Sequence, residues 1–140
     1  MSGGFLVVRA AGERYGVDLA AVEEVVDLPA PAPVPARLPS LRGVMRWRER
    51  HLSVLHLGAL MGGGPAPEAR GDTALVVRLA GVPVALEVDA VLDVVEDGGA
   101  SVGASPTAGA AGVWAVEGAL VTMLDLEALA GRLAEQEEAG

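Results

Sequence analysis

Short runs of Val, Leu and Ala, separated by polar or glycine-containing breaks, recur along the whole chain. Two such runs in residues 5–19 are joined by the turn-like residues 11–14, which predicts a β-hairpin. Residues 20–24 are too few for an independent helix, so we expect one helical turn there before a strand resumes at Val25. The start of the chain therefore favours strands over helices.

The middle of the chain shows two further apolar runs, in residues 43–57, with a charged segment between them. They follow residues 29–39, which hold five prolines. Proline cannot sit in a central strand, so this segment predicts an extended exposed connection. After a short helix at residues 57–61, the glycines at the start of residues 62–73 predict a flexible link. No Lys-Ser/Thr pair follows these glycines, which argues against a phosphate-binding loop.

The second half of the chain repeats the order of the first. Residues 73–97 again read as strand, turn, strand, short turn and strand, and residues 98–112 read as a loop of small residues. Two more strands and a helix follow, and the helix is expected to begin near Leu126 with Asp125 as its cap. This repetition suggests an internal duplication.

A shift of 69 residues makes the duplication quantitative. Across residues 5–28 and 43–62, 17 of 44 positions are identical to their shifted counterparts, where about five would match by chance. The sequence thus predicts one domain over residues 1–140, with a first subdomain at 5–62 and a second at 74–131. The expected fold is all-β with short helices: two similar five-stranded, SH3-like β-barrels and a C-terminal helix.

Composition narrows the class of protein. The chain has 140 residues, 51% of them hydrophobic, which is enough for one compact core. A net charge of −9 argues against a nucleic-acid partner, and the absence of cysteine excludes a disulfide framework or a thiolate metal site. The apolar runs are too short to span a membrane, and the first residues do not resemble a signal peptide. We therefore expect a soluble cytoplasmic protein without direct membrane insertion.

The charged segment between the middle apolar runs is the candidate binding site. The segment differs from its counterpart in the second half at every position. In the first half it consists of Arg46, Trp47, Arg48, Glu49 and Arg50. In the second half the same positions hold Ala115, Val116, Glu117, Gly118 and Ala119. The fold therefore tolerates neutral residues there, and the charges serve binding or solubility. The simpler alternative is a solvated face that prevents edge-strand pairing.

Chemistry of other kinds finds little support in the sequence. His51 and His56 are five residues apart on one expected strand, so they should point to opposite faces, with no third ligand nearby. The acid pairs Glu23/Glu24 and Asp93/Glu96 accompany no pocket-forming motif that would support catalysis. We expect no metal, no cofactor and no enzymatic activity.

Several motifs, taken in order, resemble the CheW family of chemotaxis coupling adaptors over about residues 5–133. The matching pieces are F-L-V-V at 5–8, Y-G-V-D-L at 15–19, V-E-E-V-V at 22–26, L-R-G-V at 41–44, L-x-V-L-x-L at 52–57, L-E-V-D-A-V-L-D-V at 86–94 and M-L-D-L-E-A-L at 123–129. The resemblance implies two five-stranded barrels, no catalysis and two partners. These partners are the regulatory domain of a chemotaxis histidine kinase and the cytoplasmic tip of a methyl-accepting receptor.

The resemblance also implies which residues bind. The family reads Asn-Leu-Arg-Gly in the central hairpin, and only Arg48 matches that motif here, because Arg46, Trp47 and Glu49 replace its other residues. Glu24 matches the family's acid that pairs with this arginine, so the two should lie within salt-bridge reach. Glycine in the family and at Gly118 also predicts a positive φ at Glu49.

The expected receptor site accordingly consists of four residues, and the kinase site of three on the edge of the first barrel. The receptor set is Glu24, Arg46, Trp47 and Arg48, and the kinase set is Val22, Val25 and Asp27. The predicted function is an adaptor that couples receptor to kinase in a signalling array, and alone it should be a monomer or weak dimer. The alternatives are a divergent member that binds only one partner and a small-molecule-binding double barrel.

Overall fold

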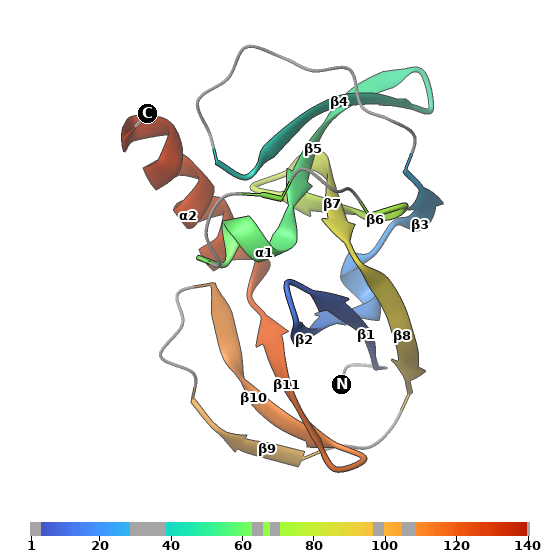
Figure 1. Ribbon diagram of the computed structural model, residues 1–140, viewed down its shortest axis with the longest axis vertical. Helices are drawn as coiled ribbons and strands as arrows, with labels where there is room; N and C mark the ends of the chain where they lie inside the picture. Colours follow the sequence, from blue (N-terminus) through green and yellow to red (C-terminus); the bar gives the residue numbers. More distant parts are fainter. Residues whose placement is uncertain are drawn as a thin grey trace.

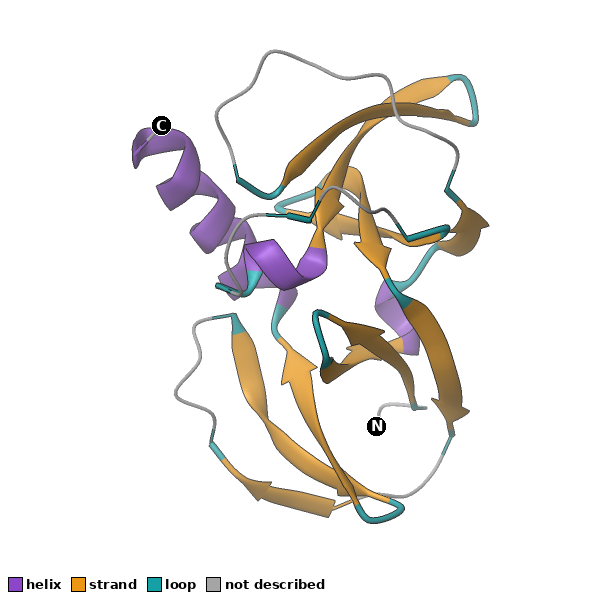
Figure 2. Ribbon diagram, in the orientation of Figure 1, coloured by secondary structure: helices purple, strands orange, loops and turns teal. Residues whose placement is uncertain are grey.

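The structure is a computed structural model that describes residues 4–28, 39–62, 66–67, 71–96, 100–104 and 109–139. Nearly all of the predicted proline-rich connection, and half of the predicted link at residues 62–73, lie outside these ranges. Within them the chain forms eleven strands, two α-helices and one short 3-10 helix (Figure 2). Strand content dominates, as the sequence predicted.

The elements follow the chain in two similar series. The first series is β1 (Phe5–Ala10), β2 (Glu13–Asp18), the 3-10 helix η1 (Leu19–Ala21), β3 (Glu24–Asp27), β4 (Leu41–Trp47), β5 (Arg50–His56) and α1 (Leu57–Leu60). The second is β6 (Thr73–Leu79), β7 (Val82–Val88), β8 (Ala90–Val95), β9 (Ala100–Gly103), β10 (Ala110–Val116), β11 (Ala119–Leu124) and α2 (Leu126–Ala139). Strand β9 corrects the sequence prediction, which assigned its residues to a loop because alanine, serine and glycine weaken the strand signal.

Two curled sheets make up the molecule, and each draws strands from both halves of the sequence. One sheet has six strands in the order β8-β1-β2-β11-β10-β9, and the other has five in the order β3-β6-β7-β5-β4 (Figure 1). The hairpin β1–β2 thus joins the second-half strands, and β6–β7 joins the first-half strands. The boundaries 5–62 and 74–131 remain a prediction for the repeats, but the sheets do not follow them.

Two parallel strand pairs join each exchanged hairpin to the strands of the other half. β5 pairs with β7 from Val54 opposite Ala85, and β11 pairs with β2 from Thr122 opposite Tyr15, both in parallel. The remaining strand pairs are antiparallel. Because each half contributes a hairpin to the other's sheet, the two barrels are bound by backbone hydrogen bonds and cannot separate without unfolding.

The exchanged hairpins also explain why their strands are buried on both faces. In β1, Leu6 and Val8 join a central core shared by both sheets and both α-helices, while Phe5 and Val7 fill the inside of the six-stranded barrel. β6 alternates in the same way toward the five-stranded barrel. A strand buried on both faces needs a continuous apolar sequence, which is what these two strands have.

Four tight hairpin turns share one conformation. Their two central residues all have positive φ: Ala11-Gly12 at 52° and 80°, Arg48-Glu49 at 48° and 62°, Ala80-Gly81 at 53° and 82°, and Glu117-Gly118 at 48° and 83°. These are the values of a type I′ turn, which favours glycine in the second position. Glu49 is the exception among these four turns, and the positive φ predicted for it is confirmed.

Equivalent residues cap the two α-helices. The Asp125 carboxylate accepts hydrogen bonds from the backbone N–H groups of Glu127 and Ala128 at 3.1 and 3.2 Å, which confirms the predicted cap. The His56 Nδ1 atom accepts one from Ala59 N–H at 3.0 Å. The duplication therefore kept the capping function while changing the residue that supplies it.

Candidate functional site

The candidate site forms where the two edges of the five-stranded sheet approach each other. β3 and β4 are the outer strands of this sheet, so neither pairs with the other in the ladder. Side chains bridge them instead: Glu24 begins β3, while Trp47 ends β4 and Arg48 follows in the turn. We call these three residues the Glu24 corner.

One carboxylate oxygen organises the corner. Glu24 Oε1 accepts a hydrogen bond from the Trp47 indole N–H at 3.1 Å and another from the Arg48 guanidinium at 2.8 Å. The guanidinium carbon also lies 4.6 Å from the centre of the Trp47 ring, in cation–π range. The predicted contact between Glu24 and Arg48 is confirmed.

Burial divides the three residues into a base and an exposed tip. Trp47 is only 8% exposed and belongs to the core of the five-stranded barrel with Leu52 and Val54. The side chain of Arg48 is 65% exposed and that of Glu24 is 40% exposed. The corner therefore presents a charged guanidinium that is held in position from below by the indole and the carboxylate.

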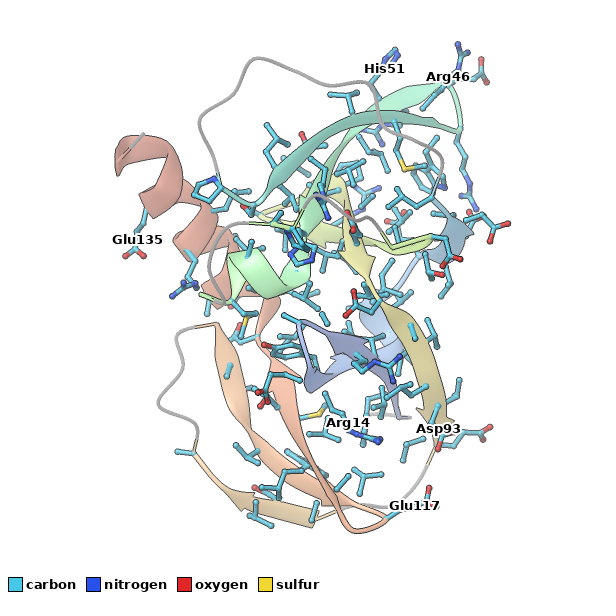
Figure 3. All side chains as sticks on the ribbon, viewed as in Figure 1. Arg14, Arg46, His51, Asp93, Glu117 and Glu135 are labelled. Atoms are coloured by element: carbon cyan, nitrogen blue, oxygen red, sulfur yellow. The ribbon has the colours of Figure 1, made fainter. Side chains whose placement is uncertain are left out.

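The other predicted site residues lie close by on the same strands. Arg46 is exposed on the outer face of the hairpin, directly opposite His51 in the register, and Figure 3 shows both at the tip of β4–β5. Along β3, Val25 and Asp27 are exposed, whereas Glu24 and Val26 are half-buried and lie on the face that carries the Glu24 corner, where Val26 packs against the barrel core. Thus the expected receptor and kinase residues on β3 occupy opposite faces.

Val22 differs from its two companions in the predicted kinase set. It lies just before β3, is half-buried and packs against the central core. Neighbouring Glu23 accepts a hydrogen bond from Arg78 at 2.6 Å, which ties this segment to β6. Arg78 therefore supports the strand that carries Glu24, while Arg9, its counterpart in the first half, is an exposed residue on the other sheet.

The sequence analysis missed a buried ion pair. Arg42 donates two hydrogen bonds to the Glu87 carboxylate, at 2.8 and 3.1 Å, and Glu87 is 1% exposed. The same carboxylate accepts the backbone N–H of Gly71 at 2.8 Å, and Arg42 also donates to the carbonyl of Pro67. These contacts join β4, β7 and the link between the repeats, so their role is structural. The signal for this pair in the sequence is Glu87, a single acid within the apolar run of β7.

His56 is the second residue whose role was missed. It is 4% exposed, whereas His51 is exposed, so the two histidines do face opposite ways as predicted. Burial lowers the pKa of His56 below its ordinary 6.5; nearby Glu87 and Asp89 raise it and Arg42 lowers it further. A neutral imidazole suits its position, because Nδ1 must accept the hydrogen bond that caps α1.

The described parts of the chain offer neither a metal-binding cluster nor a membrane-spanning helix. No group of three His, Cys, Asp or Glu side chains there is arranged to hold a metal ion. None of the helices described is long and apolar enough to cross a membrane.

The fold is a double β-barrel domain built from an internal duplication. Residues 4–134 match the family model of the CheW-like domain, so the chain belongs to the CheW-like family. Members of this family are non-enzymatic scaffolds, and the chain is accordingly a chemotaxis-type adaptor.

The known structures include a similar fold. The crystal structure of the scaffolding protein TtCheW from Thermoanaerobacter tengcongensis superposes with a TM-score of 0.79. The two chains are 24% identical, and the match covers 92% of this chain and 88% of the other. At this identity the similarity supports the fold alone. No curated protein matches the chain.

Proposed function

We propose that this protein couples the cytoplasmic tip of a methyl-accepting receptor to the regulatory domain of a chemotaxis-type histidine kinase, with the Glu24 corner and Arg46 as the receptor site. The observation that carries the proposal is the exposed Arg48 guanidinium, which is fixed by Glu24 and stacked on Trp47. A guanidinium held in one direction loses less entropy on binding than a free one. It can form charge-assisted hydrogen bonds to a receptor carboxylate or carbonyl.

The contrast between the two halves supports a binding role for this corner. At the equivalent positions the second half has Val116 and Glu117, and the same type of turn forms there. The charged and aromatic residues of the corner are thus not required by the hairpin. Residues that a fold does not require are better explained by recognition of a partner.

The two faces of β3 suit simultaneous binding of two partners. Val25 is 45% exposed on the face away from the Glu24 corner, and Asp27 lies on that same face. A kinase domain seated on Val22, Val25 and Asp27 would leave Arg48 accessible to the receptor. The adaptor would then act in the cytoplasm, at receptor arrays.

The test is a three-component sedimentation experiment with the full chain, a receptor cytoplasmic tip and a kinase regulatory domain. The proposal predicts one peak that contains all three proteins, and a receptor–kinase complex that depends on the adaptor. Val25→Arg should reduce the amount of kinase in the complex and leave the receptor bound, whereas Arg48→Ala should weaken receptor binding several-fold and leave the kinase bound. Binding of only one partner by the wild-type protein would support the divergent alternative and contradict coupling.

A further inference from the structure

The duplication gives the molecule two equivalent pockets of about 390 Å3, one beside each α-helix. The pocket beside α2 is lined in part by Ser53, Ala80, Val82, Val84 and Ala130. The pocket beside α1 is lined by their counterparts 69 positions away, which are Thr122, Ala11, Glu13, Tyr15 and Met61. We call the second one the α1 pocket, and it lies where α1, β2 and β11 meet near the centre of Figure 1.

The two pockets differ in polarity. Val82 and Val84 line the pocket beside α2, whereas Glu13 and Tyr15 stand at the equivalent positions of the α1 pocket. The β1–β2 and β6–β7 hairpins have turns of the same type, so a hairpin of this kind forms with either pair of side chains. The carboxylate and the phenol of the α1 pocket are therefore available for binding a ligand.

The polar side chains of the α1 pocket lie on one face of the six-stranded sheet. Glu13 and Tyr15 are two residues apart on β2, so their side chains point to the same face. Thr122 on β11 is the parallel partner of Tyr15 in the register, and it adds a second hydroxyl to the lining. One carboxylate and two hydroxyls thus line one wall of the pocket.

Tyr15 is the residue that indicates a ligand. It is only 7% exposed, and it packs in the central core. A buried tyrosine hydroxyl usually has a hydrogen-bond partner, but this one forms no hydrogen bond with any described residue. Every fully buried polar side-chain atom in the described part of the chain has a partner, so the Tyr15 hydroxyl is accessible, and the pocket that it lines is where it can be reached.

The charge of the α1 pocket favours a cation. Among the described residues that line it, Glu13 is the only charged one, and it forms no ion pair with another described residue. The Arg132 guanidinium, which lies beside Gly62, donates to the Leu60 carbonyl at 2.8 Å instead. Burial and the nearby Glu13 carboxylate raise the pKa of Tyr15 above its ordinary 10.0, so the hydroxyl stays neutral and adds no second charge.

We infer that the α1 pocket binds an alkylammonium group, with the Glu13 carboxylate as its counter-charge and the Tyr15 hydroxyl as a hydrogen-bond acceptor. An ammonium group has three donors and no acceptor, which matches a carboxylate and a hydroxyl. Ala11 and the flexible Met61 side chain supply apolar contacts for the alkyl chain. The pocket is larger than the cavity of roughly 150 Å3 that holds benzene, so a chain of several carbons fits.

This ammonium group belongs either to a free amine or to a lysine side chain of a partner protein. The two sources share one chemistry, and the experiment below separates them. None of the lining residues belongs to the predicted receptor or kinase set. The inference therefore does not depend on the coupling function.

The test titrates the full chain, labelled with 15N, with butylamine, which is an ammonium ion at neutral pH, and with its neutral analogue butan-1-ol. Butylamine should shift the amide signals of Glu13, Gly62 and Thr122. It should bind about tenfold more tightly than butan-1-ol, because only the ammonium ion forms a charged hydrogen bond with Glu13.

N-acetyl-L-lysine methylamide identifies the source of the ammonium group. If this compound binds at least as tightly as butylamine, the pocket accepts a lysine side chain of a protein. If butylamine binds and the lysine compound does not, the ligand is a free amine. Either result supports an ammonium site.

Two substitutions test the two polar groups separately. Glu13→Gln should weaken butylamine binding about tenfold. Glu117→Gln is its matched control, because it removes an exposed acid that does not line the pocket, and it should bind like the wild type. Tyr15→Phe should weaken binding about fivefold. Its melting temperature should be nearly unchanged, because the hydroxyl has no partner among the described residues to lose.

Three results would overturn the inference. The first is the absence of shifts at these amides up to about 50 mM butylamine, a concentration at which even a weak ligand binds. The second is equal binding of butylamine and butan-1-ol, or equal weakening in Glu13→Gln and Glu117→Gln, since the pocket would then not recognise charge. The third is a Tyr15→Phe variant that melts at a lower temperature and binds butylamine like the wild type. The first two remain measurable even if Tyr15→Phe does not fold.

Discussion

The β4–β5 hairpin and its counterpart in the second half, the β10–β11 hairpin, have turns of one type and different side chains. At the Glu24 corner, three side chains from two edge strands hold one another by hydrogen bonds of 2.8 and 3.1 Å. At the equivalent place in the six-stranded barrel, the turn residues Glu117 and Gly118 have similar φ values, but Val116 and Glu117 stand where the first half has Trp47 and Arg48. The six-stranded barrel thus forms without the charged and aromatic residues of the Glu24 corner. The side chains that the first half has at this corner are therefore available to recognise a partner protein.

The same comparison applies to the interior. The buried pair Arg42–Glu87 lies in the five-stranded sheet, whereas its counterparts in the six-stranded sheet are Ala111 and Asp18. Asp18 is exposed and only caps η1 through Ala20 N–H at 3.0 Å. The five-stranded sheet therefore depends on a buried charge pair and the six-stranded sheet does not have one at the equivalent place, so we expect the two sheets to respond unequally to mutation there.

The largest expected effect follows from that inequality. Glu87→Gln keeps the shape of the side chain but leaves the Arg42 charge without its buried counter-ion, so the free energy of unfolding should fall by about 3–5 kcal/mol. Asp18→Asn, the matched change, should cost less than about 1 kcal/mol, because asparagine also caps. Urea unfolding of both variants measures this. Equal losses of unfolding free energy in the two variants would show that the buried pair stabilises the fold no more than the exposed Asp18 does.

The second effect concerns the turns. Glu49 has φ of 62°, where the three other tight turns have glycine, so Glu49→Gly should raise the free energy of unfolding by about 1 kcal/mol. The reverse change in the other half, Gly118→Glu, should lower it by a similar amount. Thermal melting of the two variants compares them directly. An unchanged melting temperature in Glu49→Gly would mean that other contacts of Glu49 offset the strain.

The third effect is the pH dependence of the stability that the His56 helix cap contributes. Burial lowers the pKa of His56 below 6.5 in the folded state. Below pH 6.5 the unfolded chain therefore binds a proton that the folded chain does not. The stability that His56 contributes is complete above that pH and is lost as the pH falls below it.

His56→Asn isolates this contribution, because asparagine can accept the Ala59 N–H and does not titrate. Urea unfolding at about pH 7, 6 and 5 should show a flatter pH dependence for the variant than for the wild type, by about 1 kcal/mol or less over this range. Parallel curves would mean that the His56 cap does not depend on its neutral form.

Much of the fold could be predicted from the sequence because its signals are local. The hairpin turns at Gly12 and Gly81 and the cap at Asp125 each depend on residues within a few positions of one another. The exchange of hairpins between the sheets could not be predicted, because the two repeats share the same order of strands and turns, and this order does not indicate which sheet a hairpin joins. The parallel pairs β5–β7 and β2–β11 carry no turn between them that would reveal them.

The site could be predicted in part for a similar reason. The contact between Glu24 and Arg48 came from the family resemblance, since 24 residues separate the two along the chain. The role of Trp47 as both a core residue and a hydrogen-bond donor to Glu24 needed the three-dimensional structure. The Arg42–Glu87 pair could not be predicted, because 45 residues separate the two side chains and their strands β4 and β7 are not neighbours in the sheet.

The smallest expected effect on folding belongs to the most important residue. The Glu24–Arg48 pair is largely exposed, so Arg48→Ala should change the free energy of unfolding by only about 0–1 kcal/mol. Arg9→Ala, an exposed arginine on the other sheet, is the matched control. Arg78 is unsuitable, since its contact with Glu23 supports the same segment as Glu24.

The affinity of these variants for a receptor cytoplasmic tip, measured by isothermal titration calorimetry, tests the central claim that the Glu24 corner recognises the receptor. The account predicts that Arg48→Ala binds several-fold more weakly than the wild type, with a nearly unchanged melting temperature, and that Arg9→Ala binds like the wild type. An Arg48→Ala protein that is folded and binds the receptor tip as tightly as the wild type would contradict it.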